Sequence, residues 1–486
     1  MCLSIRTPSC VLVITLAICG RLAAAGLEAG VAKATITPDV RAGKVYMAGF
    51  GNNRVATGVH DDLWVRCLAL ETADAKLAMC DADLIGLFHD DVLKVRAKVK
   101  AAMPEVTQVI VASAHDHEGP DTMGLWGPTP FESGIDPRYM DWLDDRIAET
   151  ALRALRSSKP ARMELARDDH PLLALLQDDS RPPYVKDPHL LVMKLASASG
   201  GAPIATLVNW SDHPETLDSR NTLITADYPH WLCQYVEDHG GGTAVFFNGS
   251  IGGLLSTLGE QVSLLDPDTG RVAKDGTWKK AQLFGDTIGE LATRALSSGE
   301  EAPVDSIVLR QAVIYSPLEN DGFRVAGPLG VYRGRKPLYT DGQADATVAE
   351  RELPGLGKVK YATGHDLQTE VDYIQLRSGD RLLAEIATVP GEIYPELVNG
   401  GITRYAGADY PDAPFEPALR SHMHSTYQFI FGLANDEIGY IIPKAEWDNK
   451  PPWLQLRKER WYGEVNSAGP EGAGRITRAL VGLAAR

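Results

Sequence analysis

His115 and His117 follow directly on residues 109–114, a run of small and β-branched apolar residues. The run shows no polar alternation, so we predict a strand that is buried on both faces. Residues i and i+2 of a strand point to the same side, so both imidazoles would project together from the strand's end. Open α/β sheets bind ligands at such ends. A single histidine is usually a hydrogen-bonded core or surface residue, but a His-x-His pair at a strand end indicates a metal site.

Three later segments share this pattern of an apolar strand that runs into a turn holding a metal-capable side chain. His213 lies just past an apolar strand, and Pro214 fixes the backbone behind it. Glu392 follows residues 386–389 through a Pro-Gly turn, and Tyr440 follows residues 429–431 and a glycine. Two imidazoles and a carboxylate would bind zinc and leave room for water. Taken singly, these residues could equally be a capping histidine, a solvated glutamate and a buried tyrosine.

The first 25 residues have the features of a secretory signal peptide. Arg6 supplies a positive charge, residues 10–18 form an apolar stretch, and residues 23–25 are an Ala-Ala-Ala cleavage site. We therefore expect a secreted or periplasmic protein whose mature chain begins at Gly26. No later stretch is long and apolar enough to predict a membrane span.

The composition is that of a globular protein with an acidic surface. Apolar residues make up 44% of the 486-residue chain and charged residues 23%. The net charge is −16, and cleavage of the signal peptide removes Arg6 and Arg21, which leaves −18. Such a surface repels nucleic acid and anionic membranes, so neither is an expected partner.

Three cysteines remain in the mature chain, namely Cys67, Cys80 and Cys233. This number is too small for a disulfide-rich fold. Cys67 and Cys80 lie on two apolar runs that could form a hairpin, so a bridge between them is geometrically allowed. Three separate small buried residues are the expected arrangement.

Helical and strand patterns alternate along the chain, which predicts an α/β fold with mixed β-sheets flanked by α-helices. The expected helices cover residues 90–103, 138–158, 228–238 and 282–297. The expected strands cover residues 63–70, 77–81, 109–114, 204–209, 244–247, 371–376 and 381–389. Residues 318–370 are rich in glycine and proline and are expected to form an irregular insertion on the substrate side.

The order of several motifs resembles the catalytic domain of the neutral/alkaline non-lysosomal ceramidases, over nearly the whole mature chain. The matching pieces share short Gly, Pro, His and Asp motifs and occur at residues 30–38, 47–50, 58–63, 113–120, 213–214, 223–227, 390–392, 432–435 and 439–440. The resemblance implies one zinc ion held by His115, His213, Glu392 and Tyr440. It also implies that His117 lies beside the metal, as a base or acid, and that residues 26–486 form one zinc hydrolase domain.

Two departures from the family pattern concern the substrate. The family's Gly-rich active-site turn corresponds to residues 248–256, where Gly253 replaces the acid and Leu255 falls at the serine position, unless a shift of one residue brings Ser256 there. The family's C-terminal immunoglobulin-like domain is not expected in this chain. The resemblance thus implies a secreted hydrolase that cleaves a carbon–nitrogen amide bond. It implies a small-molecule or lipid N-acyl substrate that need not be ceramide. It also implies Ser256 as a second catalytic residue beside His117.

Two other interpretations stay open. One is a different metallohydrolase, either a two-metal amidohydrolase or a phosphoesterase, although eight regular βα units are not visible in the sequence. The other is a secreted binding protein whose catalytic site has decayed, which the altered Gly-rich turn favours and the four candidate ligands oppose.

Overall fold

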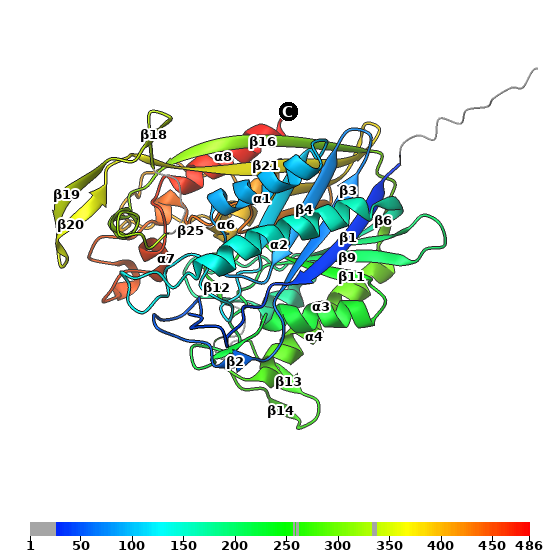
Figure 1. Cartoon of the computed structure of the whole chain (residues 1–486), viewed down its shortest axis with the longest axis horizontal. Coiled ribbons are helices and arrows are strands. Elements are labelled where there is room, and N and C mark those ends of the chain that lie inside the picture. Colours follow the sequence, from blue (N-terminus) through cyan, green and yellow to red (C-terminus); the bar gives the residue numbers. More distant parts are fainter. Residues whose placement is uncertain (1–25, 256–257, 259–261, 333–337) are drawn as a thin grey trace, which may run out of the picture.

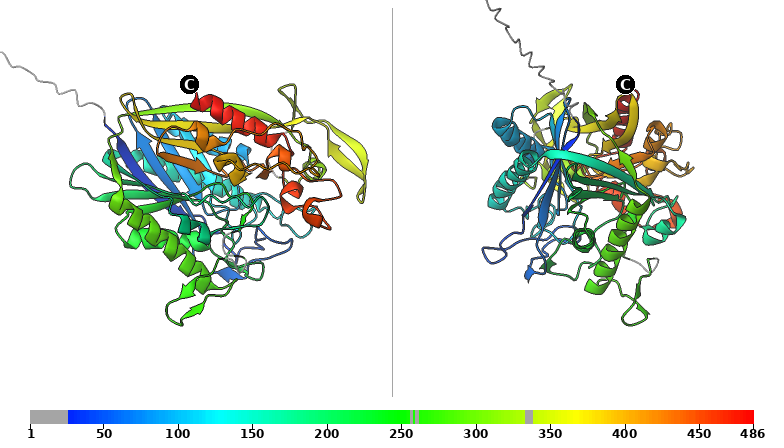
Figure 2. Two further views of the ribbon diagram at one scale, coloured as in Figure 1. Left: turned by 180° about the vertical axis from the view of Figure 1, so that it is seen from behind. Right: turned by 90° about the vertical axis from the view of Figure 1, so that its right-hand side faces the viewer.

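Two β-sheets lie face to face between layers of helices in the computed structural model of the chain (Figure 1 and Figure 2). The structure describes residues 26–255, 258, 262–332 and 338–486. The predicted signal peptide and Ser256 lie outside these residues. The arrangement agrees with the expected α/β class of mixed sheets flanked by helices.

The larger sheet is mainly antiparallel, with a parallel pair at each end. Its strands, in spatial order, are β11 (Thr243–Asn248), β9 (Pro203–Trp210), β8 (Leu190–Ser197), β6 (Lys159–Asp168), β1 (Glu28–Thr35), β3 (Trp64–Glu71), β4 (Lys76–Ala82) and β5 (Gln108–Ser113), and β15 (Glu300–Ala302) pairs with β6. The predicted strands of residues 63–70, 77–81, 109–114, 204–209 and 244–247 are all present here.

The second sheet carries the predicted hairpin of residues 371–389 at its centre. Its strands, in spatial order, are β18 (Gln343–Asp345), β17 (Leu338–Thr340), β21 (Asp366–Ser378), β22 (Arg381–Thr388) and β24 (Tyr427–Phe431), and β16 (Ser306–Pro317) pairs with β21. The β22–β24 pair is parallel. Both strands therefore end at the same edge, and that edge leads to the candidate site.

Amphipathic helices cover the outer faces of the sheets, as their apolar stripes require. They are α1 (His89–Ala102), α2 (Pro137–Arg156), α3 (Tyr228–Asp238), α4 (Trp278–Ala295) and α8 (Gly472–Ala484). The helices α1 and α2 pack on the half of the larger sheet that contains β1, β3, β4 and β5. The helices α3 and α4 pack on the half that contains β8, β9 and β11, and α8 packs on the second sheet. The start of α2 is fixed by Asp136, whose side chain accepts the Arg138 N–H, and by Pro137 at the first helical position.

The core between the sheets is apolar and is crossed by a few buried amides. The rings of Phe247 and Phe431 stack across it with centroids 4.0 Å apart. Asn209 of β9 donates to the Phe247 and Ile430 carbonyls, which belong to different sheets. Such bonds lock the two sheets at one separation and register.

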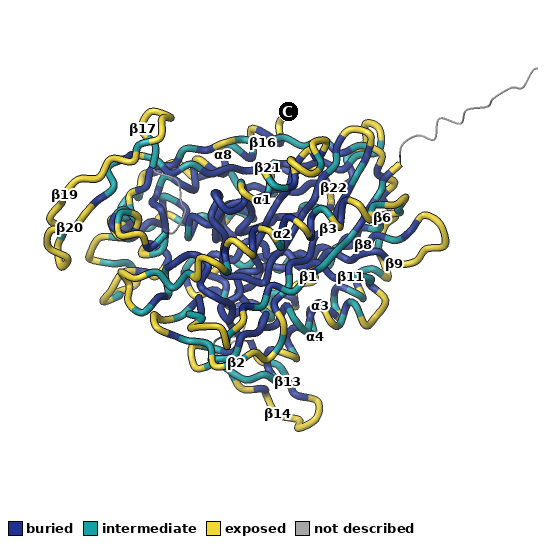
Figure 3. Tube along the Cα trace, viewed as in Figure 1, coloured by how far each residue is buried: buried dark blue, intermediate teal, exposed yellow. Residues whose placement is uncertain are grey.

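Residues 318–370 are more regular than expected. They contain α5 (Asp321–Ala326), the β17–β18 hairpin and a second hairpin of β19 (Val348–Leu353) and β20 (Gly357–Ala362). The β19–β20 hairpin projects from one end of the molecule and is largely exposed (Figure 3). Glycine and proline residues lie in the turns between these short strands. Because these residues are so frequent here, the strands could not be predicted from the sequence.

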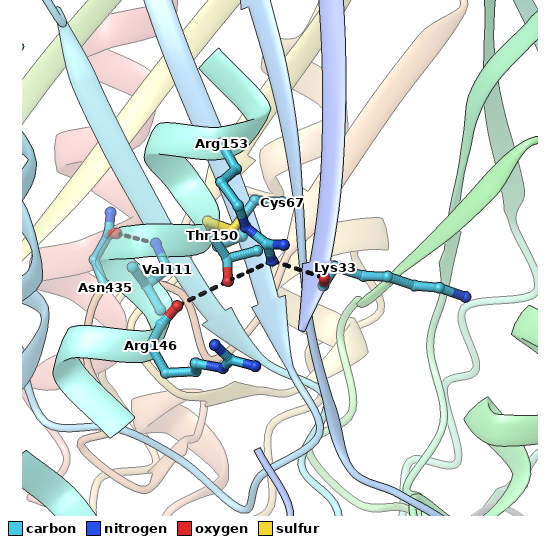
Figure 4. The surroundings of a disulfide bond; sticks show 8 residues. Lys33, Cys67, Val111, Arg146, Thr150, Arg153 and Asn435 are labelled. Carbon is cyan, nitrogen blue, oxygen red and sulfur yellow. Dashed lines mark hydrogen bonds between the residues drawn. A yellow bond between two sulfur atoms is a disulfide. The ribbon is translucent and has the colours of Figure 1, made fainter. Parts of the chain in front are cut away.

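Cys67 and Cys80 form a disulfide, so the expectation of three separate cysteines is wrong. The two residues are directly opposite each other in the antiparallel β3–β4 pair, with Cα atoms 4.0 Å apart. The bond lies beneath α2, near Thr150 and Arg153 (Figure 4). Cys233 is free and buried.

Short elements complete the fold. They are β2 (Gly58–Val59), β7 (Asp178–Asp179), β10 (Leu223–Ile224), β12 (Leu254–Leu255), β13 (Leu265–Asp266), β14 (Arg271–Val272), β23 (Glu392–Ile393), β25 (Tyr440–Ile441), α6 (Pro395–Asn399) and α7 (Tyr462–Val465). Among the described residues, none of the helices has the length and apolar character needed to cross a bilayer.

Candidate metal centre

The loop after β5 carries His115 and His117, but the strand is shorter than predicted. It ends at Ser113, and His115 has a φ of 68°, in the left-handed region. The two imidazoles therefore converge through a turn and not through the two-residue repeat of a strand. Their ring centroids are 4.9 Å apart.

His213 follows β9 and faces His115, with ring centroids 4.8 Å apart. One buried side chain, Asn248 at the end of β11, fixes both loops. Its amide donates to the Ala114 carbonyl at 2.8 Å and to the Asp212 carbonyl at 2.9 Å, immediately before each histidine. β5 and β11 are the two end strands of the larger sheet, and they contact each other at this point. Asn248 sets the spacing of the two loops.

Glu392 and Tyr440 reach the same place from the second sheet. They are directly opposite each other in the short parallel pair of β23 and β25, which continues from the ends of β22 and β24. Both side chains line the same cavity as His115. The structure thus brings together four residues that are separated by up to 325 positions in the chain.

Three donor atoms converge within the distances that a tetrahedral metal requires. The Nε2 atoms of His115 and His213 lie 3.4 and 3.0 Å from the same Glu392 oxygen, Oε2. Ligands that are each about 2.0–2.2 Å from a tetrahedral ion lie about 3.4 Å apart. The Nδ1 atoms of the two histidines contact the Ile85 and Leu254 carbonyls at 2.8 and 2.6 Å. Such contacts hold the proton on Nδ1 and leave Nε2 as the ligand atom.

The charge distribution favours a cation at this point. Burial alone would raise the pKa of Glu392, but the imidazoles of His115 and His213 outweigh it and lower that pKa. Burial would lower the pKa of His213, but the hydrogen bond to Glu392 and the charge of Glu215 raise it. Burial and the neighbouring Glu392 carboxylate hold the pKa of Tyr440 well above its usual value. Without a metal, Tyr440 therefore keeps its proton.

His117 lies beside these donors on the cavity wall. Burial, together with the neighbouring His115, His213 and Arg54 side chains, holds the pKa of His117 well below its usual value, so the ring is neutral at pH 7. His115, His117 and His213 also form a buried trio whose potential ligand atoms lie within 4.8 Å of one another, the one such cluster found among the described residues. These three side chains could also hold a metal ion.

The Gly-rich turn contributes backbone to the site. The Leu254 carbonyl accepts from His213, and Leu254 and Leu255 form β12, which pairs with β7. Gly253 has a φ of 83° and packs against Asp179 and Tyr394, so a side chain at this position would be strained. Ser250 of the same turn is buried and donates to Asp187.

Two candidate functional residues, Asn248 and Glu215, were not predicted from the sequence. Asn248 read as the first residue of the Gly-rich turn, and nothing local showed that it bridges two distant loops. Glu215 is two residues after His213 and buried, and its Oε2 lies 3.5 Å from His117 Nδ1. The sequence feature that could have indicated Glu215 is its position in a His-Pro-Glu turn directly after an apolar strand.

A cavity of about 350 Å³ opens from the candidate metal-binding side chains. His117, Glu392 and Tyr440 form its polar end. Its other walls are mainly apolar. They come from the segment before α1 (Phe88), the loop after His117 (Met123 and Trp126) and the segment after β16 (Phe323, Tyr332 and Leu338). Its volume is at the lower end of the 300–1,000 Å³ range usual for small-molecule sites.

The comparisons with known proteins identify the fold. No family model matches the chain, and no curated protein sequence matches it. Among solved structures, neutral ceramidase from Pseudomonas aeruginosa has a TM-score of 0.65 at 16% identity, over 95% of this chain and 74% of that one. A ceramidase complexed with C2 gives the same TM-score and identity, over 95% and 75%. The chain therefore has a ceramidase-like α/β fold.

Proposed function

We propose that this protein is a secreted, zinc-dependent hydrolase that cleaves the carbon–nitrogen bond of an N-acyl amide. The observation that carries the proposal is the convergence of His115 and His213 Nε2 on one oxygen of Glu392, at 3.4 and 3.0 Å, in the wall of a cavity. Borderline nitrogen and oxygen donors of this kind suit zinc. Tyr440, opposite Glu392, is proposed as the fourth ligand.

A zinc ion held by these residues would polarise a carbonyl oxygen and acidify water. The protein groups supply the rest of the chemistry. His117 is neutral and can accept a proton at a ring nitrogen, then return it to the leaving amine. Tyr440 keeps its proton in the metal-free site and can donate a hydrogen bond to the substrate's oxygen when it is not a ligand. Ser256 stays proposed as a second catalytic residue on the Gly-rich turn.

The cavity supports an N-acyl substrate with one compact apolar group. Its polar end holds the reacting side chains, and its aromatic and aliphatic walls would exclude water from an acyl chain. About 350 Å³ suits one small or medium-sized group better than the two long chains of ceramide. The glycine at position 253 also leaves the turn without a carboxylate to bind a polar head group. We therefore propose that ceramide is a poor substrate.

Export through the signal peptide of residues 1–25 is part of the proposal. The Cys67–Cys80 disulfide supports it, because disulfides persist in oxidising compartments. Sequencing the N-terminus of the exported protein should give Gly26. An intact Met1 terminus would contradict export with cleavage at this site.

The test of the activity is a substrate panel with purified, zinc-loaded protein: N-acyl amides of graded chain length, the matching esters, phosphoesters and ceramide. We expect amide hydrolysis that a chelator abolishes and zinc restores, with ceramide the weakest amide substrate. Turnover of phosphoesters alone would favour another metallohydrolase. Bound zinc with no turnover of any substrate would favour a binding protein, and efficient ceramide hydrolysis would overturn the substrate argument.

Two variants separate metal binding from catalysis. His213→Ala should lose the metal because a central ligand is removed. His117→Ala should keep the metal and lose about 10²–10⁴-fold in turnover, as expected for a general base or acid. If His117→Ala loses metal and His115→Ala retains it, the roles of the two residues are reversed.

A further inference from the structure

Glu215 is a buried acidic residue that is neither a proposed zinc ligand nor a proposed acid or base. The residue is 5% exposed. Its Oε1 has no hydrogen-bond partner among the described residues, and its Oε2 lies 3.5 Å from Nδ1 of His117. Burying a carboxylate with so few partners is costly.

The backbone around His117 is built to hold the ring against Glu215. The His117 N–H donates to the Pro214 carbonyl at 3.1 Å, which ties the His117 loop to the residue before Glu215. The Arg54 guanidinium donates to the His117 carbonyl. Gly49, with a φ of 99°, packs directly on the ring, and a Cβ there would lie 2.5 Å from the His117 side chain. These contacts fix the backbone of His117, and the packing of Gly49 limits the positions that the ring can take.

We infer that Glu215 is a positioning residue for His117: its carboxylate accepts the Nδ1–H of the ring and so fixes the tautomer in which Nε2 carries the free lone pair. A separation of 3.5 Å is long for a hydrogen bond. Catalytic hydrogen bonds are often long in the ligand-free state and tighten when the substrate binds. Neither ring nitrogen of His117 has a hydrogen-bond partner in the described part of the chain, so Nδ1 is free to bond to Glu215.

His117 differs from the two other histidines in the group that orients its ring. His115 and His213 are oriented by backbone carbonyls, those of Ile85 and Leu254. A carboxylate differs from a carbonyl because it also stabilises the positive charge that a ring gains when it accepts a proton. This pairing suits a residue that takes up a proton in each turnover better than a residue that only binds metal. The role assigned to Glu215 rests on the proposed amide hydrolysis.

The experiment compares Glu215→Ala and Glu215→Gln with the wild type, and uses Glu385→Gln as a matched control. Glu385 is fully buried and accepts from Tyr373 and from the His424 and Ser425 backbone, so its substitution tests the effect of a lost buried charge elsewhere. Second-sphere partners of histidines usually contribute 10–100-fold. We expect Glu215→Ala to lower kcat by about 10–100-fold with KM and zinc content unchanged, Glu215→Gln to recover part of the loss, and Glu385→Gln to keep wild-type kcat.

Two further measurements make the inference refutable. In a His117→Ala background, Glu215→Ala should cause no additional loss of kcat, because Glu215 acts through that ring. A loss of the same size in both backgrounds would overturn the inference, and loss of zinc from Glu215→Ala would show a metal ligand instead. Nitrogen-15 NMR of the histidines in metal-free protein should show His117 protonated on Nδ1 in the wild type and redistributed in Glu215→Ala. This spectrum tests the pairing even if no amide is hydrolysed, whereas an unchanged tautomer would refute it.

Discussion

Replacing Asn248 by aspartate tests whether one buried amide holds the two histidine loops together. The substitution keeps the shape of the side chain and removes the N–H donors. Asn248 Nδ2 donates to the carbonyls of Ala114 and Asp212, at 2.8 and 2.9 Å, and these residues immediately precede His115 and His213. In Asn248→Asp, both buried carbonyls lose their donor.

The expected cost follows from these two contacts. A buried acceptor left without its donor costs about 1–3 kcal/mol, so the free energy of unfolding should fall by about 2–6 kcal/mol. The lower end applies if the new carboxyl takes up a proton and donates it to one carbonyl. Because the loops would lose their common anchor, zinc affinity should also fall, by about 10–100-fold.

Asn209→Asp is the matched control. Asn209 is also buried between the sheets and donates to two carbonyls, those of Phe247 and Ile430, at 2.9 and 2.8 Å. Urea denaturation should show similar losses of stability for the two variants. Competition with a chelator should show weaker zinc binding for Asn248→Asp alone. Equal zinc affinities in the two variants, or an Asn248→Asp protein of wild-type stability, would refute the reasoning.

Three other predictions concern stability and the ring of His117. Replacing both Cys67 and Cys80 by alanine should lower stability by about 3 kcal/mol, the value for a loop of about 15 residues, and should remove the effect of reductant on the melting temperature. Burial raises the pKa of Asp144 to about 7. This pKa is above the unfolded value of 3.8, so the folded state binds a proton that the unfolded state has lost. The free energy of unfolding should therefore fall as the pH rises from about 4 to 7, by at most about 4 kcal/mol. The Asp144→Asn variant should show a flatter stability–pH profile over this range. Gly49→Ala should displace the His117 ring and reduce turnover by up to about 100-fold without loss of zinc, and normal turnover would contradict that packing.

The elements that local patterns define could be predicted from the sequence. The helix expected over residues 138–158 agrees with α2 to within two residues. Its apolar residues Leu143, Ile147, Ala151 and Leu155 recur at helical spacing, and such an amphipathic stripe must face a core. The hairpin of β21 and β22 followed from two apolar runs around a short polar turn. The strand-end positions of His213 and Glu392 were visible for the same reason.

The features that depend on distant pairing could not be predicted. The disulfide required the register that sets Cys67 opposite Cys80, and the same sequence with a register shift would separate them. The convergence of His115 and His117 depends on the left-handed φ of His115, which no residue type in the motif announces. The bridging by Asn248 and the contact of Glu215 with His117 join loops that are far apart in the chain, so only the fold reveals them.

A zinc titration of metal-free protein, followed by turnover of an N-acyl amide, tests the central claim most directly. With one metal centre at His115, His213, Glu392 and Tyr440, activity should rise linearly with added zinc and stop rising at one equivalent. The His213→Ala protein should show no activity at any zinc concentration in the same titration. A break at two equivalents, or full occupancy at one equivalent without amide hydrolysis, would contradict the single-zinc amide hydrolase.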